Sequence, residues 1–234
     1  MLIKYLPMFR YIISILLIVP SFTMAQNQEK DTTTFSLTSF VPQGIKFGVD
    51  GFGLIRTGIN PNLTTIEGKA EFDFKKYIGV FETGVYTNTI DSLPKYRYNI
   101  SGSFFKIGID ANLLHKSEDK SVFTFGLRYG RARQTDKLQY RINDPVYGFT
   151  DNLSAVNSKI GGGWVEMVVG LQVEIFNNLY LGYSARYKLG LRFKQQEFVP
   201  FEMAGYGRTE TVSQKNSTWG FNYYLLYSIQ WEGK

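Results

Sequence analysis

A long run of alternating side chains limits what this chain can fold into. Over residues 178–194, apolar side chains at every second position oppose a face made mostly of glycine, serine, lysine and arginine. A strand places successive side chains on opposite faces, so a period of two predicts one continuous β-strand here. A tilted strand of about 9–11 residues already crosses a bilayer, and the core of a soluble protein does not need one this long.

The same alternation recurs along the rest of the chain. It predicts further strands over 45–57, 64–74, 77–86, 104–113, 122–131, 164–175 and 219–231. In the first of these the apolar face switches at Asp50-Gly51, where we expect a β-bulge, because one extra residue reverses the facing. The chain is therefore expected to form eight strands.

The connections between these strands are short and long in turn. Short connections are expected at Lys75-Lys76, His115–Lys120 and Asn177-Asn178, and longer ones at 59–63, 88–98, 135–159 and 195–217. Outer-membrane barrels sort their connections in this way, with tight turns at one end and long loops at the other. The sequence predicts an all-β fold, an eight-stranded antiparallel transmembrane β-barrel of outer-membrane type, apolar outside and polar inside.

The first 25 residues have the pattern of an export signal. Lys4 and Arg10 precede and flank an apolar run at 11–20, and small residues lead up to Ala25. This is the pattern of a secretory signal peptide cleaved after Ala25, and the run is far shorter than the ~20 residues of a membrane-spanning helix. We expect a signal peptide at 1–25, a periplasmic segment at 26–43, the barrel at 44–234, and localisation in the outer membrane of a Gram-negative cell.

The polar faces of the predicted strands would fill the barrel with charge. Because a small eight-stranded barrel has room inside only for side chains, and a buried charge without a partner is costly, near-equal numbers of acids and bases predict a sealed lumen of ion pairs. A narrow ion path or proton relay is the alternative interpretation. The expected network comprises Lys46, Asp50, Glu67, Lys69, Glu71, Asp73, Glu82, Lys106, Asp110, Arg128, Glu166, Glu174, Arg186, Lys188 and Arg192.

The sequence offers little for catalysis or metal binding. It has no cysteine and a single histidine, His115, which disfavours a transition-metal site. With Ser117 and Glu118, His115 faintly resembles the His-x-Ser pattern of barrels that deacylate lipid A, but it lies in a short turn that we expect on the periplasmic side. No catalytic residue, metal site or cofactor is therefore expected.

Aromatic side chains are concentrated in the two longest predicted loops. They either form a docking surface for a partner or pack on one another across the barrel mouth, and the sequence leaves both open. The expected partners are the lipid bilayer and lipopolysaccharide, with another outer-membrane protein or a lipoprotein as a further possibility; a net charge of +6 without a basic run predicts no nucleic acid. The aromatic residues are Tyr140, Tyr147, Phe149, Phe198, Phe201 and Tyr206.

Several stretches resemble an uncharacterised family of outer-membrane β-barrel proteins of Bacteroidota, a domain of unknown function. They are FFKIGIDANLL at 104–114, GLRYG at 126–130, EMVVGLQVEIFNNLYLGYSARYK at 166–188 and GFNYYL at 220–225. The resemblance spans about residues 45–231 and implies the same barrel and compartment, without any catalytic residue. We expect a non-enzymatic structural or accessory subunit of an outer-membrane complex; an envelope-lipid-modifying enzyme or a small channel on the same barrel is the alternative.

Overall fold

The computed structural model describes residues 42–92, 96–115, 121–143, 150–209 and 216–231. The predicted signal peptide and residues 26–41 of the predicted periplasmic segment lie outside this range. The elements in chain order are β1 (Gly44–Asp50), α2 (Gly51–Ile59), β2 (Leu63–Phe74), β3 (Tyr77–Ser92), β4 (Tyr96–Asn112), β5 (Val122–Asn143), β6 (Thr150–Phe176), β7 (Leu179–Phe193), β8 (Glu202–Met203), β9 (Gly207–Arg208) and β10 (Ser217–Gln230).

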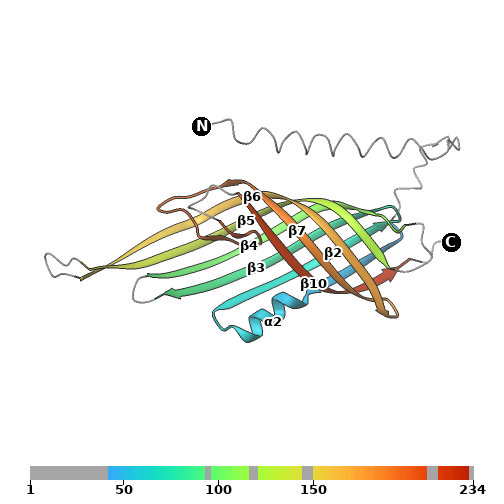
Figure 1. Cartoon of the computed structure of the whole chain (residues 1–234), viewed down its shortest axis with the longest axis horizontal. Helices are drawn as coiled ribbons and strands as arrows, with labels where there is room; N and C mark the ends of the chain where they lie inside the picture. Colours follow the sequence, from blue (N-terminus) through green and yellow to red (C-terminus); the bar gives the residue numbers. More distant parts are fainter. Residues whose placement is uncertain (1–41, 93–95, 116–120, 144–149, 210–215, 232–234) are drawn as a thin grey trace, which may run out of the picture. The chain divides into compact units, whose positions relative to one another are not determined.

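Eight of these strands form a closed antiparallel barrel (Figure 1). Their order around the barrel is β1-β10-β7-β6-β5-β4-β3-β2, and β1 closes the ring by pairing with both β10 and β2. The tight turns between β2 and β3, and between β6 and β7, lie at the same end as Gly44 and Gln230, which pair with each other. The predicted eight-stranded antiparallel barrel is confirmed.

The polarity of the wall is that of a membrane barrel. Outward side chains such as Ile109 and Leu127 are more than 60% exposed, whereas Glu82 and Arg186 on the inward face are fully buried. Strands that present apolar side chains outward and charges inward suit a barrel surrounded by lipid. In lipid all backbone polar groups must be paired, and a closed sheet pairs them. Among the described residues, no helix is long and apolar enough to cross a membrane.

The predicted strand at 45–57 is wrong in its second half. The strand ends at Asp50, and Gly51–Ile59 forms helix α2 instead of continuing past a bulge. Phe52, Ile55 and Ile59 recur at helical spacing, so the same apolar residues that resembled a strand also suit a helix. The Thr57 hydroxyl fastens the helix to β2, where it accepts from the Thr65 N–H at 2.9 Å and donates to the Thr65 carbonyl at 3.2 Å.

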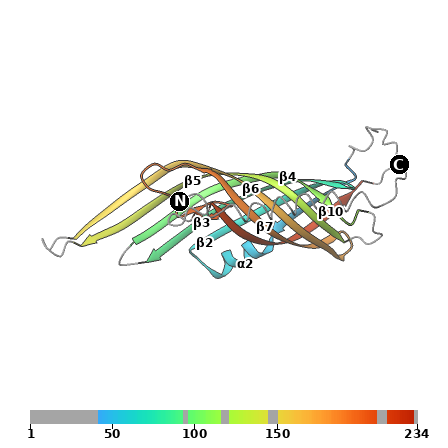
Figure 2. The ribbon, with the colours of Figure 1, turned by 45° about the horizontal axis from the view of Figure 1, so that its top comes forward.

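The strands extend far into the segments predicted as long loops. β6 has 27 residues and pairs with β5 as far as Thr150 opposite Asn143, so most of the predicted loop 135–159 is a projecting hairpin (Figure 2). One irregularity interrupts the β5–β6 ladder, opposite the stretch from Gln134 to Asp136. In the β6–β7 ladder the register shifts between Gly163 and Trp164 and again between Glu174 and Phe176. In β5 the alternation continues in this extension, with Leu138, Tyr140 and Ile142 between polar residues. The signal was therefore present in the sequence, and the predicted strand ended too early at residue 131.

Candidate functional site

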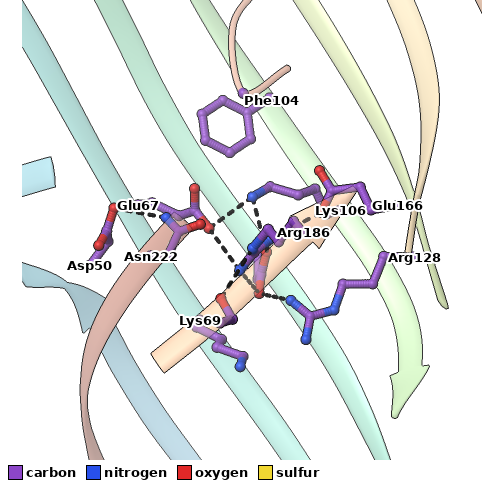
Figure 3. A network of polar contacts seen from close by, with 12 residues as sticks. Asp50, Glu67, Lys69, Phe104, Lys106, Arg128, Glu166, Arg186 and Asn222 are labelled. Atoms are coloured by element: carbon purple, nitrogen blue, oxygen red, sulfur yellow. Dashed lines mark hydrogen bonds and ion pairs between the residues drawn. The ribbon is translucent and has the colours of Figure 1, made fainter. Parts of the chain in front are cut away.

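The middle of the lumen is a dense network of charged side chains (Figure 3). Arg186 of β7 lies at its centre and donates to Glu82 at 2.6 Å, to Glu166 at 3.2 Å and to the Tyr224 hydroxyl at 2.7 Å. Its guanidinium is fully buried. An arginine presents five donors in a planar fork, and here that fork joins β7 to three other strands of the barrel.

Glu82 of β3 receives most of the surrounding positive charge. Besides Arg186 it pairs with Arg128 and, at 3.0 Å, with Lys106. Lys106 also donates to Glu67 at 2.8 Å, and Arg128 to Asp110 at 2.7 Å. Strand register brings these groups together, because Glu82 lies directly opposite Lys106 on β4. Each charge is therefore balanced by neighbours around the ring.

A second layer lies nearer the tight turns. Lys69 pairs with Glu71 at 2.5 Å, and the Gln172 amide donates to Glu71 at 2.9 Å while its oxygen accepts from Lys46 at 3.0 Å. The Lys46 ammonium also sits 4.3 Å from the centre of the Tyr180 ring. The two layers place six buried acids against six buried bases: Asp50, Glu67, Glu71, Glu82, Asp110 and Glu166, with Lys46, Lys69, Lys106, Arg128, Arg186 and Lys188.

An aromatic layer covers the network on the side of the long loops. Phe104 and Trp164 pack there with Met203 and Tyr206, which the segment between β7 and β10 folds into the mouth. Gln134 holds this segment by two hydrogen bonds of 2.8 Å, to the Glu202 carbonyl and from the Ala204 N–H. The cover and the charge network therefore follow one another along the inside of the barrel.

The wall has a side opening above the end of β1. Pairing of β1 stops at Asp50 opposite Tyr224 and at Val49 opposite Gly68, and beyond these points helix α2 stands between β2 and β10. A vestibule of about 670 Å³ lies here, and its lining includes inward residues such as Lys188 together with the outward residues Trp219 and Phe221. This vestibule reaches from the lipid-facing surface to the top of the charge network.

Most of the predicted lumen residues lie in the two layers, and three do not. Asp73 and Glu174 cap the tight turns instead, where they accept from the backbone N–H groups of Lys75 and Asn178. The prediction that Arg192 lies in the lumen is wrong, because its side chain is exposed and lines a groove on the outer wall. Leu191 is an unpaired extra residue between the Trp164–Gly190 and Gly163–Arg192 pairs, and this bulge reverses the facing of the strand end.

Residues that carry no charge were missed by sequence reasoning. Tyr224 hydrogen-bonds both Arg186 and Glu67, Gln172 joins Lys46 to Glu71, and Asn222 donates to Asp50 at 2.9 Å. All three lie at inward positions of predicted strands, so the alternation could have identified them as members of the network.

The loop aromatics mostly pack on the barrel mouth. Phe198 and Phe201 contact Tyr98, with ring centres 6.3 and 4.8 Å away, and Tyr206 packs on Trp164. Tyr140 lies on the projecting part of β5 and is 37% exposed. Tyr147 and Phe149 lie outside the described residues.

The described residues hold no cluster of acids and histidine suited to a metal ion. His115 lies in the turn after β4, with Nδ1 3.0 Å from the Asn112 carbonyl oxygen. This turn is at the end of the barrel that carries the other tight turns. Ser117 and Glu118 lie outside the described range.

Comparison with known proteins identifies the family. The model of a domain of unknown function, DUF6048, matches residues 8–233. The chain belongs to this family. No curated protein matches it. Among solved structures, the DUF6048 chain is similar to Ail, the attachment invasion locus protein of Yersinia pestis, with 10% identity, a TM-score of 0.41 and coverage of 80% of this chain and 97% of Ail. A second Ail structure, in complex with the heparin analogue sucrose octasulfate, has 11% identity and a TM-score of 0.38 over the same shares.

Proposed function

We propose that this DUF6048 protein is an outer-membrane barrel with a sealed lumen that acts, without catalysis, as a structural or accessory subunit of an outer-membrane complex. The observation that carries the proposal is the buried centre of the lumen, where Arg186 pairs with both Glu82 and Glu166 and all three side chains are fully buried. A pathway for ions needs charges that meet water, and these do not. In an eight-stranded barrel, whose interior is filled by side chains, the outer wall and the mouth are the surfaces that can bind a partner.

In the proposed orientation the tight turns face the periplasm, together with the start of β1 and the end of β10. The projecting hairpin of β5 and β6 then extends from the cell, as the longer connections of such barrels do. The chain has no cysteine, so single cysteines can report the orientation. A membrane-impermeant maleimide should label Gln139→Cys on intact cells and leave Asn177→Cys unlabelled until the cells are opened.

The projecting hairpin supports the accessory role. Tyr140 and Leu153 lie opposite each other across β5 and β6, each 37% exposed, and Ile142 beside them is 42% exposed. Exposed apolar side chains gathered above a membrane mark a surface for another protein. We assign this face to a second outer-membrane protein or a lipoprotein.

The test is affinity purification of the tagged barrel from native membranes in a mild detergent. A stoichiometric partner is expected with the wild-type chain, and the Tyr140→Ser/Leu153→Ser variant should lose it. Gln139→Ala, also on the projecting part of β5, is the matched control and should retain it. The proposal would be overturned if the barrel purified without a partner. It would also be overturned by stepwise conductance in planar bilayers, if reversing the charge at Glu82 abolished that conductance.

The vestibule favours a second function, the binding of an amphipathic lipid that enters sideways. Trp219 and Phe221 at its outer edge suit an acyl chain, and Arg56 in its lining suits an acidic headgroup. Lipid extracted from the purified barrel should be enriched in one species by mass spectrometry. Asn222→Leu, which narrows the entrance, should remove that species, and equal lipid content in both proteins would exclude this function.

A further inference from the structure

A groove of about 850 Å³ runs over the outer wall of the barrel across β4 to β7. It lies where the outward apolar band of these strands ends: Tyr129 and Leu191, the last outward apolar residues of their strands, are part of its lining. Its position is therefore the level at which lipid acyl chains give way to headgroups. The groove is separate from both the lumen and the vestibule.

The lining of this groove carries five cations and no acid: Arg131, Arg133, Lys159, Arg192 and Lys194. Arg131 and Arg133 project from β5, and the other three come from β6 and the end of β7. Within the described parts of the chain, none of the five side chains forms an ion pair or a hydrogen bond. Their charge is therefore available to a ligand.

Two distortions of the sheet turn cations into the groove. Lys159 has a φ of 54° where β6 carries two residues against one of β5, a conformation that a residue other than glycine adopts at a cost. The Leu191 bulge places Arg192 opposite the outward Gly163, although regular alternation would send it into the lumen after Arg186 and Lys188. Such distortions are typical of functional sites.

Glycine forms the floor between the cations. Gly163 lies opposite Arg131, and Gly161 lies opposite Arg133. At these two positions β6 therefore places no side chain between the arginines of β5 and Arg192 of β7. A Cβ built at Gly161 would first meet the Ala132 carbonyl oxygen at 3.4 Å, an ordinary contact. Space above this glycine is therefore open rather than filled by neighbours.

We propose that this groove binds the phosphate groups of lipid A, the lipid part of lipopolysaccharide, while its acyl chains lie on the apolar band beneath. The inference rests on the orientation in the proposed function, which places the groove in the outer leaflet. Guanidinium groups bind phosphate oxygens in pairs, and each basic residue near an anionic membrane surface contributes about 1 kcal/mol. A soluble anion would not need the adjoining apolar wall, whereas a phosphorylated lipid uses both.

The test measures lipid binding to the purified full chain in detergent, by native mass spectrometry. The probes are phosphorylated lipid A, the same lipid after enzymatic dephosphorylation, and inorganic phosphate as a competitor. In the Arg131→Gln/Arg133→Gln/Arg192→Gln variant, affinity for phosphorylated lipid A should fall at least about tenfold, in line with the loss of three surface cations. The control Arg97→Gln/Lys137→Gln/Arg141→Gln removes the same charge outside the groove lining and should change affinity less than twofold.

A second variant keeps every charge. Gly161→Leu fills the floor and should weaken binding to a similar degree while the barrel remains folded on a heat-shift gel. Equal losses in the groove and control triples, undiminished binding of dephosphorylated lipid, or complete displacement by millimolar phosphate would each overturn the proposal. A conducting or partnerless barrel would overturn the proposed function and leave this measurement intact, so the two failures are distinguishable.

Discussion

Arg186 and Arg192 lie on the same strand, and the fold gives them opposite surroundings. Arg186 is fully buried and contacts three carboxylates and a phenol. Arg192 is exposed on the outer wall among four other cations, and it forms no ion pair with any residue that the structure describes. A charge taken out of water must be paired, but one at the membrane boundary remains hydrated. Inside the barrel the pairing holds the structure together, and outside it the unpaired charge remains free for a ligand.

The largest expected effect comes from neutralising the inner member of this pair. Arg186→Gln leaves Glu82 and Glu166 with less positive charge in a buried site and should reduce the free energy of unfolding by about 3–5 kcal/mol. Arg192→Gln should change it by less than about 0.5 kcal/mol, as surface substitutions usually do. Unfolding by guanidinium chloride in lipid vesicles measures both free energies. Equal losses in the two variants would contradict the difference between the buried and the exposed arginine.

The aromatic cover should be nearly as intolerant of change. Gly130 faces the fully buried Trp164, and a Cβ at this position would lie 2.2 Å from the indole. Gly130→Ala should destabilise the barrel by about 1–3 kcal/mol through overpacking. In the double variant Gly130→Ala/Trp164→Leu the clash disappears, so its loss of stability should be smaller than the sum of the losses in the two single variants, measured in the same unfolding assay.

A change in the groove should have the opposite sign. Lys159 holds a positive φ, which costs an L-residue about 1–2 kcal/mol, whereas the flexibility of glycine costs about 0.5–1 kcal/mol. Lys159→Gly should therefore stabilise the barrel by about 0.5–1 kcal/mol in vesicle unfolding, even though it removes a cation. Lys159→Ala loses the same charge but keeps the backbone strain, and it should show no such gain.

The smallest effect is expected in the projecting hairpin. Asp136 lies beyond the apolar band of β5, and burial raises the pKa of its carboxyl although Tyr98 donates to it at 2.8 Å. A raised folded-state pKa means that stability falls as the pH rises past the ordinary carboxyl range. Asp136→Asn should be slightly more stable than wild type at about pH 7 and equal to it near pH 3. A difference that persists in acid would show that the carboxylate is not responsible.

The sequence alone determined the barrel. Inward and outward facing is set by the period of two within each strand, so the strands, their number and the sorting of short connections could be predicted without tertiary contacts. The same local rule located Glu82, Lys106, Arg128 and Arg186 in the lumen. These positions lie in regular stretches, where counting residues is enough.

Only the tertiary structure decided the rest. Whether Phe52 and Ile55 belong to a strand or a helix depends on where β1 stops finding partners, and both periods fit the local sequence. Arg192 faces outward because a neighbouring strand leaves Leu191 unpaired, and Lys159 faces the groove because β6 carries an extra residue against β5. A bulge is a property of two strands in register, so alternation within one strand could not reveal it, and the groove that these bulges create could not be read from the sequence.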